Sequence, residues 1–99
     1  MSLALHQRQR VAPDACPSLP RHVRIQFDPV RQAFAVLSPE RVFWPNEISL
    51  AILRLCDGRH LVRAIAAALA DEYEADPGEV AADVETFLQE WADRLLVRL

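Results

Sequence analysis

The apolar residues of this 99-residue chain change their spacing near residue 45. Over residues 21–27 apolar side chains alternate with polar ones, a period that predicts a strand with one buried face. From residue 46 onward they recur every three or four residues, the period of amphipathic helices. Strands grouped before helices predict an α+β fold, and a chain of this length suits one domain.

Three short strands are predicted in the first half of the chain. The first spans residues 21–27, and the second, which is apolar after Gln32, spans residues 32–37. Residues 41–44 form the third, between Pro39 and Pro45, and a short strand flanked by prolines is typical of a sheet edge. The side chains expected on one face of these strands are Val23, Ile25, Phe27, Phe34 and Val36.

Three helices are predicted in the second half. Asn46 is a favourable N-cap for the first, and Gly58 is expected to end it in the left-handed conformation. The second runs over residues 61–74. The third begins at Asp76, where Glu79 completes a capping pattern. The stripes expected to face the core are Ile48, Ala51, Ile52, Leu55 and Cys56, then Val62, Ile65, Ala66, Leu69, Ala70 and Tyr73, then Val80, Val84, Phe87, Leu88, Trp91 and Leu95.

The tight turn at residues 57–60 joins two of these helices and predicts a winged helix-turn-helix-like domain over residues 21–99, with the strands as the wing. Residues 1–20 hold three prolines and no sustained period, so we expect a disordered or extended tail. This tail lacks the apolar stretch of a signal peptide, and no run suits a membrane span. Residues 96–99 either add a short strand or fray.

Residues that carry catalysis or hold metals are sparse. The three histidines, His6, His22 and His60, have no metal-ligand spacing, and the cysteines form no Cys-x-x-Cys pair. With two glycines the chain offers no glycine-rich phosphate loop. We therefore expect no catalytic residue, no metal and no cofactor, in a reduced cytoplasmic setting.

The acidic charge of the helices bears on nucleic acid. Residues 79–93 contain five acids and no Lys or Arg, as expected for the solvated face of a helix. Such a surface repels phosphates, whose contact with cations dominates binding to DNA. A winged-helix transcription regulator is therefore the alternative function and not the favoured one. An enzyme is a weaker alternative, because no catalytic constellation is present.

Peptide binding has positive signals. An edge strand presents unpaired main-chain groups to which an extended peptide can add. Residues 41–44 form such a strand and carry Phe43 and Trp44, aromatic residues of the kind that anchor interfaces. Phe87 and Trp91 lie one turn apart on the last helix, where their spacing favours the core.

Several short motifs occur in a fixed order along the chain. They are Ser38-Pro39-Glu40, Asn46, the run from Ala51 to Arg59, Ile65, Leu69, Tyr73, Asp83-Val84 and Phe87-Leu88. This ordered set resembles the PqqD family over about residues 20–96. The chain departs from the family pattern at Arg41, Pro45 and Arg94, where the family usually has Gly, Leu and Gly.

The resemblance implies a peptide chaperone of the type that recognises precursors of ribosomally made, modified peptides. Such a protein would bind the precursor peptide PqqA and present it to PqqE, a radical S-adenosylmethionine enzyme, in pyrroloquinoline quinone biosynthesis. We expect a monomer or a tail-dependent homodimer with no nucleic-acid or membrane partner. The peptide would pair with the third strand beside the third helix, at Arg41, Val42, Phe43, Trp44, Val84, Phe87, Leu88 and Trp91.

Overall fold

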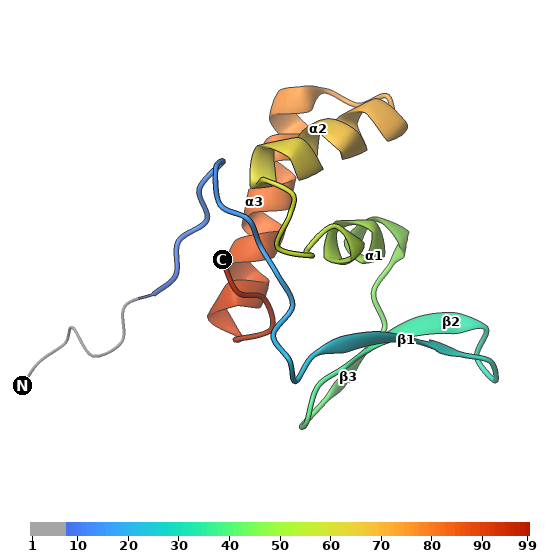
Figure 1. Cartoon of the computed structure of the whole chain (residues 1–99). Helices are drawn as coiled ribbons and strands as arrows, with labels where there is room; N and C mark the ends of the chain where they lie inside the picture. Colours follow the sequence, from blue (N-terminus) through green and yellow to red (C-terminus); the bar gives the residue numbers. More distant parts are fainter. Residues whose placement is uncertain (1–7) are drawn as a thin grey trace, which may run out of the picture.

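The computed structural model describes residues 8–99, which form a three-stranded antiparallel sheet followed by three helices (Figure 1). The predicted α+β, winged helix-turn-helix-like class is confirmed. Residues 1–7 of the predicted tail lie outside the described residues. The elements are β1 (Arg24–Asp28), β2 (Ala33–Leu37), β3 (Val42–Phe43), α1 (Glu47–Arg54), α2 (Val62–Glu72) and α3 (Pro77–Asp93).

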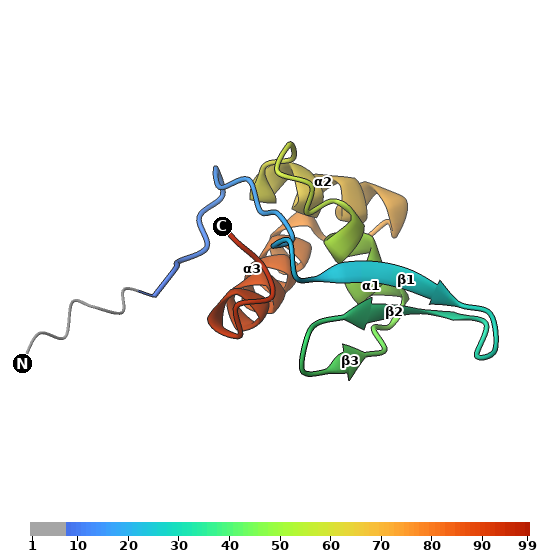
Figure 2. The ribbon, with the colours of Figure 1, turned by 60° about the horizontal axis from the view of Figure 1, so that its bottom comes forward.

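The sheet has the order β1-β2-β3, so β3 lies at an edge (Figure 2). The turn between β1 and β2 is stabilised by the Asp28 carboxylate, which accepts hydrogen bonds from the main-chain N–H groups of Val30 and Arg31. β1 begins three residues later than predicted, since a turn closes first, with the N–H of Val23 donating to the carbonyl of Pro20 over 3.0 Å.

Of the three predicted capping residues, two are confirmed and one is wrong. Asn46 accepts a hydrogen bond from the N–H of Ser49 over 2.8 Å, and Asp76 accepts one from the N–H of Glu79 over 3.0 Å. Gly58 does adopt a positive φ of 78°, but α1 already ends at Arg54. Gly58 instead lies in the loop after α1, where its N–H donates to the carbonyl of Pro17.

The N-terminal segment, residues 8–20, runs beside the helices and bends at a turn in which the N–H of Ala15 donates to the carbonyl of Ala12 (Figure 1). Ser18 forms isolated β-bridges with Asp57 and with Arg98. The two hydrogen bonds between the main chains of Ser18 and Arg98 are both 2.8 Å long. The last residues therefore pair with the N-terminal segment, which fits the short strand that was one expectation for residues 96–99.

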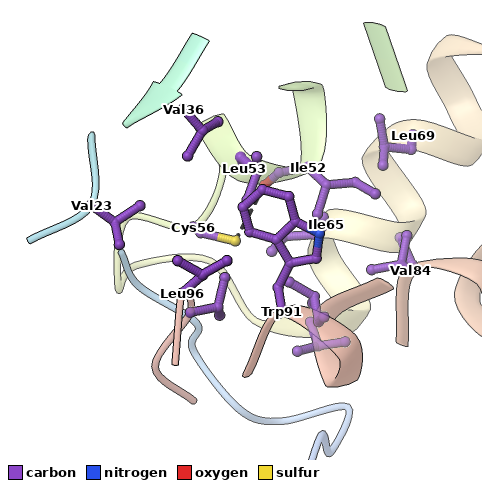
Figure 3. Packing of buried hydrophobic residues seen from close by; sticks show 14 residues of the cluster. Val23, Val36, Ile52, Leu53, Cys56, Ile65, Leu69, Val84, Trp91 and Leu96 are labelled. Carbon is purple, nitrogen blue, oxygen red and sulfur yellow. Dashed lines mark hydrogen bonds between the residues drawn. The ribbon is translucent and has the colours of Figure 1, made fainter. Parts of the chain in front are cut away.

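The core is centred on Trp91, which reaches from α3 toward the residues of α1 and the loop after it (Figure 3). Most of the predicted stripe residues are buried or packed against this cluster. The prediction is wrong for Ile48, Tyr73 and Leu95, whose exposed fractions are 51%, 37% and 68%. These residues lie at the first turn of a helix or just past its end, where fewer neighbouring elements cover the stripe.

Candidate functional site

The outer edge of β3 is unpaired among the described residues, because β3 pairs with β2 alone. The N–H of Ser38 donates to the carbonyl of Arg41 over 3.0 Å, so these two residues form a hydrogen-bonded pair. Hydrogen bonding alternates along an antiparallel ladder. The main-chain N–H and C=O of Val42 therefore point away from β2, toward solvent.

Phe43 joins this edge to the last helix. Its ring centroid lies 5.3 Å from that of Trp91, and the ring of Phe87 stacks on Trp91 with a centroid distance of 5.2 Å and an interplanar angle of 26°. Val84 and Leu88 lie deeper, with 2% and 0% of their surface exposed. The aromatic row fixes the position of β3 relative to α3, and the two aliphatic residues support that row from within the core.

The opposite face of β3 is apolar and exposed. Val42 and Trp44 expose 52% and 43% of their surface, and the guanidinium of Arg31 lies 4.6 Å from the Trp44 ring. A hollow of about 270 Å³ is lined by Val42 and Trp44 together with residues of β1 and β2. A strand added to β3 would send alternate side chains to this face and to the Phe43 side.

A second hollow, of about 420 Å³, lies where the β2–β3 turn meets the end of α3, and we call it the hairpin hollow. Arg41 belongs to it, with its guanidinium 5.3 Å from the Phe43 ring. Arg94 enters it from the last helix and lies 3.7 Å from Glu90. The hollow is lined by His22, Ser38, Pro39, Glu40, Arg41, Phe43, Arg94, Leu95 and Leu96.

The residues predicted to bind a peptide fall into three groups. Arg41, Val42, Phe43 and Trp44 follow the β3 edge; Phe87 and Trp91 form the aromatic row; and Val84 and Leu88 are buried beneath it. Sequence reasoning missed the contributions of His22, Arg94 and Leu95. They come from the ends of elements, and only the sheet and α3 together bring them to one place.

Nothing in the described residues resembles a prepared nucleophile or metal site. Burial raises the pKa of the Cys56 thiol to about 12, and its Sγ donates to the carbonyl of Ile52. Over residues 8–99 no three His, Cys, Asp or Glu side chains gather as metal ligands would. In the same range no helix is both long enough and apolar enough to cross a membrane.

Comparison with known proteins links this arrangement to one family. The family described as "Coenzyme PQQ synthesis protein D (PqqD)" matches residues 34–97. A "PqqA binding protein" of Rhodopseudomonas palustris (strain TIE-1) is 48% identical over 88 residues, which cover 89% of this chain and 86% of that protein.

Two solved structures share the fold. The NMR structure of the PqqD truncation of Methylobacterium extorquens PqqCD, described as a stand-alone recognition element for ribosomally synthesised and post-translationally modified peptides, superposes with a TM-score of 0.75. It is 37% identical, with 90% of this chain and 95% of that one covered. The crystal structure of PqqD from Xanthomonas campestris is 35% identical, with a TM-score of 0.57 and coverage of 90% and 99%.

Proposed function

Since this chain belongs to the PqqD family, as its sequence predicted, we propose that it binds the precursor peptide PqqA and presents it to the radical S-adenosylmethionine enzyme PqqE. The observation that carries the proposal is the unpaired edge of β3, at which the main chain of Val42 points outward. The name of the relative from Rhodopseudomonas palustris supports PqqA as the peptide.

In this proposal the peptide adds to the sheet as a fourth strand. Main-chain hydrogen bonds to Val42 supply affinity, and side-chain contacts on the two faces select the peptide. One set of peptide side chains meets Arg41 and Phe43, with Phe87 and Trp91 behind, and the alternate set meets Val42 and Trp44. Val84 and Leu88 act from beneath, by holding the aromatic row in place.

The proposed role is binding without catalysis, in the cytoplasm where precursor and enzyme meet. A rigid aromatic row and a preformed edge support it, because a binding surface that is ordered in advance loses less entropy when the peptide arrives. The chain then acts by raising the local concentration of PqqA at the enzyme, which requires no chemistry of its own.

Calorimetric titration with synthetic PqqA tests the binding step. Val42→Pro removes the outward N–H and should weaken binding by at least tenfold, about 1.4 kcal/mol, roughly the effect of one hydrogen bond. Val42→Thr is the matched control, because it keeps the N–H and the β-branched shape. Circular dichroism checks that both variants fold.

Amide hydrogen exchange in the wild-type protein tests the same step without a mutation. PqqA should slow exchange at the N–H of Val42, because an added strand accepts a hydrogen bond from it. Unchanged exchange at Val42 in a protein saturated with PqqA would place the peptide elsewhere and reject pairing with β3.

Presentation to PqqE needs its own experiment. Reduced PqqE is incubated with PqqA and S-adenosylmethionine, with and without this chain, and the cross-link between the Glu and Tyr side chains of the peptide is followed by mass spectrometry. The proposal expects product with the wild-type chain and markedly less with Val42→Pro. Equal product in the absence of the chain would reject presentation while leaving peptide binding intact.

A further inference from the structure

Leu95 adopts a backbone conformation that usually belongs to glycine. Its φ is 63°, and it follows Arg94, the C-cap residue of α3, as the left-handed residue of a Schellman turn. The N–H of Leu96 donates to the carbonyl of Trp91, and the N–H of Leu95 donates to that of Ala92, both over 2.9 Å. A side chain at this position strains the backbone because its Cβ crowds the neighbouring carbonyl.

Burial does not explain why a leucine occupies this strained position. Leu95 exposes 68% of its surface, so little apolar contact within the fold offsets the strain. The side chain instead lines the hairpin hollow. Strained residues that the fold itself does not need tend to occur at functional sites. The position of Leu95 therefore indicates that its side chain meets something outside the chain.

The charge around the hairpin hollow indicates what that something is. Four arginines gather here, against two glutamates, although the whole chain has a net charge of −3. Guanidinium groups bind carboxylates through paired hydrogen bonds, more strongly than they bind neutral groups. The hairpin hollow itself is lined by Arg41, Arg94 and Glu40, and a neighbouring hollow is lined by Arg21 and Arg24. Glu90 forms the ion pair with Arg94.

We infer that the hairpin hollow is a specificity pocket for an acidic side chain of the PqqA peptide and an apolar side chain next to it. Arg41 and Arg94 bind the carboxylate, and Leu95 packs against the apolar group. The inference rests on the proposed function, since Arg41 continues the β3 edge along which the peptide would run. It adds that the peptide must present an acidic and an apolar side chain at the β2–β3 turn.

Glu74 provides a matched control for Leu95. It follows Tyr73, the C-cap residue of α2, and has a φ of 49°. It belongs to a second Schellman turn, in which the N–H of Ala75 donates to the carbonyl of Ala70. Glu74 is exposed and does not line the hairpin hollow. Replacement by glycine relieves the same backbone strain at both positions, but only one of them touches the proposed pocket.

The first test compares Leu95→Gly with Glu74→Gly. Neither variant should have a lower melting temperature, and each can gain up to about 4 °C, because glycine suits the left-handed conformation. Titration with PqqA at about 0.15 M salt, where distant charges are screened, should show binding about fivefold weaker for Leu95→Gly and unchanged for Glu74→Gly. A stable Leu95→Gly protein with wild-type affinity would overturn the role of Leu95.

The second test couples the arginines to the acids of the peptide. Arg41→Gln and Arg94→Gln are titrated with PqqA and with PqqA peptides in which one Glu or Asp at a time becomes the amide. One of the amide peptides should bind the wild-type protein about fivefold more weakly than PqqA does. The same peptide and PqqA should bind Arg41→Gln or Arg94→Gln with equal affinity, because the arginine that distinguishes them is gone. Arg63→Gln on α2 changes the net charge equally, and there the loss should persist.

Failure of this inference and failure of the proposed function look different. If wild-type protein does not bind PqqA, the proposed function fails and the pocket fails with it. Suppose instead that wild-type protein binds PqqA, but each amide peptide loses the same affinity for the wild type as for Arg41→Gln, Arg94→Gln and Arg63→Gln. The proposed function then stands and the pocket is rejected.

Discussion

Asp93 ties the start of the described chain to the last helix. Its two carboxylate oxygens accept hydrogen bonds from Nε and Nη2 of Arg8, over 2.8 and 2.7 Å, and Oδ1 also accepts one from Gln89. The hydrogen bond from Arg8, followed by that from Gln89, lowers the pKa of Asp93 despite some desolvation. Since both partners are partly exposed, the ion pair makes a small contribution to stability.

We predict that Arg8→Gln raises the pKa of Asp93 toward its ordinary value. The pKa is lowered in the folded protein, so the contribution of Asp93 to stability is present above about pH 4 and is lost as the pH falls further. An NMR titration of the Asp93 carboxyl carbon measures this. Arg63→Gln, with the same change in net charge, should leave the pKa low. An unchanged pKa in Arg8→Gln would show that Arg8 does not hold Asp93 in solution.

For single residues, the sequence correctly predicted roles that depend on contacts close along the chain. Asn46 and Asp76 cap helices as predicted, because a cap is completed within four residues. The exposure of Leu95 could not be predicted from its stripe, because that stripe assumes a helix that continues through it. The sequence also could not predict that Arg41 and Arg94 line the same hollow, because this depends on how the sheet packs against α3.

At the scale of elements, α2 begins without a side-chain cap. Its N-cap residue, Leu61, has no side chain that could accept a hydrogen bond. The first N–H groups of the helix donate instead to the N-terminal segment, from Val62 to the carbonyl of Ala15 over 2.8 Å and from Arg63 to that of Pro13 over 3.0 Å. The predicted tail thus stabilises a helix far from it in sequence.

We predict that removal of residues 1–19 destabilises the protein by about 2 kcal/mol or more, since two helix N–H groups lose their partners and buried Pro17 is lost. Removal of residues 1–10 is the control, because it keeps both carbonyl acceptors. Urea unfolding followed by circular dichroism compares the two. Equal stability of both truncated proteins and the full chain would show that the segment does not cap α2.

The same contacts bear on self-association. In the structure residues 8–20 contact the body of their own chain, through main-chain hydrogen bonds that a second copy could also supply. Dimers that depend on this segment therefore stay a prediction for high concentration, with a monomer in dilute solution.

At the scale of the whole molecule, charge is divided between the two halves of the fold. Residues 1–46 carry six arginines and three acids, whereas residues 47–99 carry five arginines and eleven acids. The exposed acids of α3 lie on the helical half of the winged helix-turn-helix. A helix with this charge repels the phosphates that a DNA-binding helix must approach.

We predict that the protein does not bind duplex DNA with sub-micromolar affinity at physiological salt. Fluorescence anisotropy with a labelled duplex of mixed sequence measures this, and titration of the same protein stock with PqqA confirms that it is active. Sub-micromolar binding that weakens steeply as salt rises would favour the transcription regulator instead.

The cap on α2 has a consequence for how freely the N-terminal segment can be redesigned. Its acceptors are carbonyl oxygens, which every amino acid carries, so the cap depends on the path of the segment and hardly on its side chains. Exposed positions such as Asp14 and Cys16 can be exchanged, or can bear a dye or a tether, while the helix stays anchored. A reporter attached there would test the proposed peptide capture at β3 without occupying that strand edge.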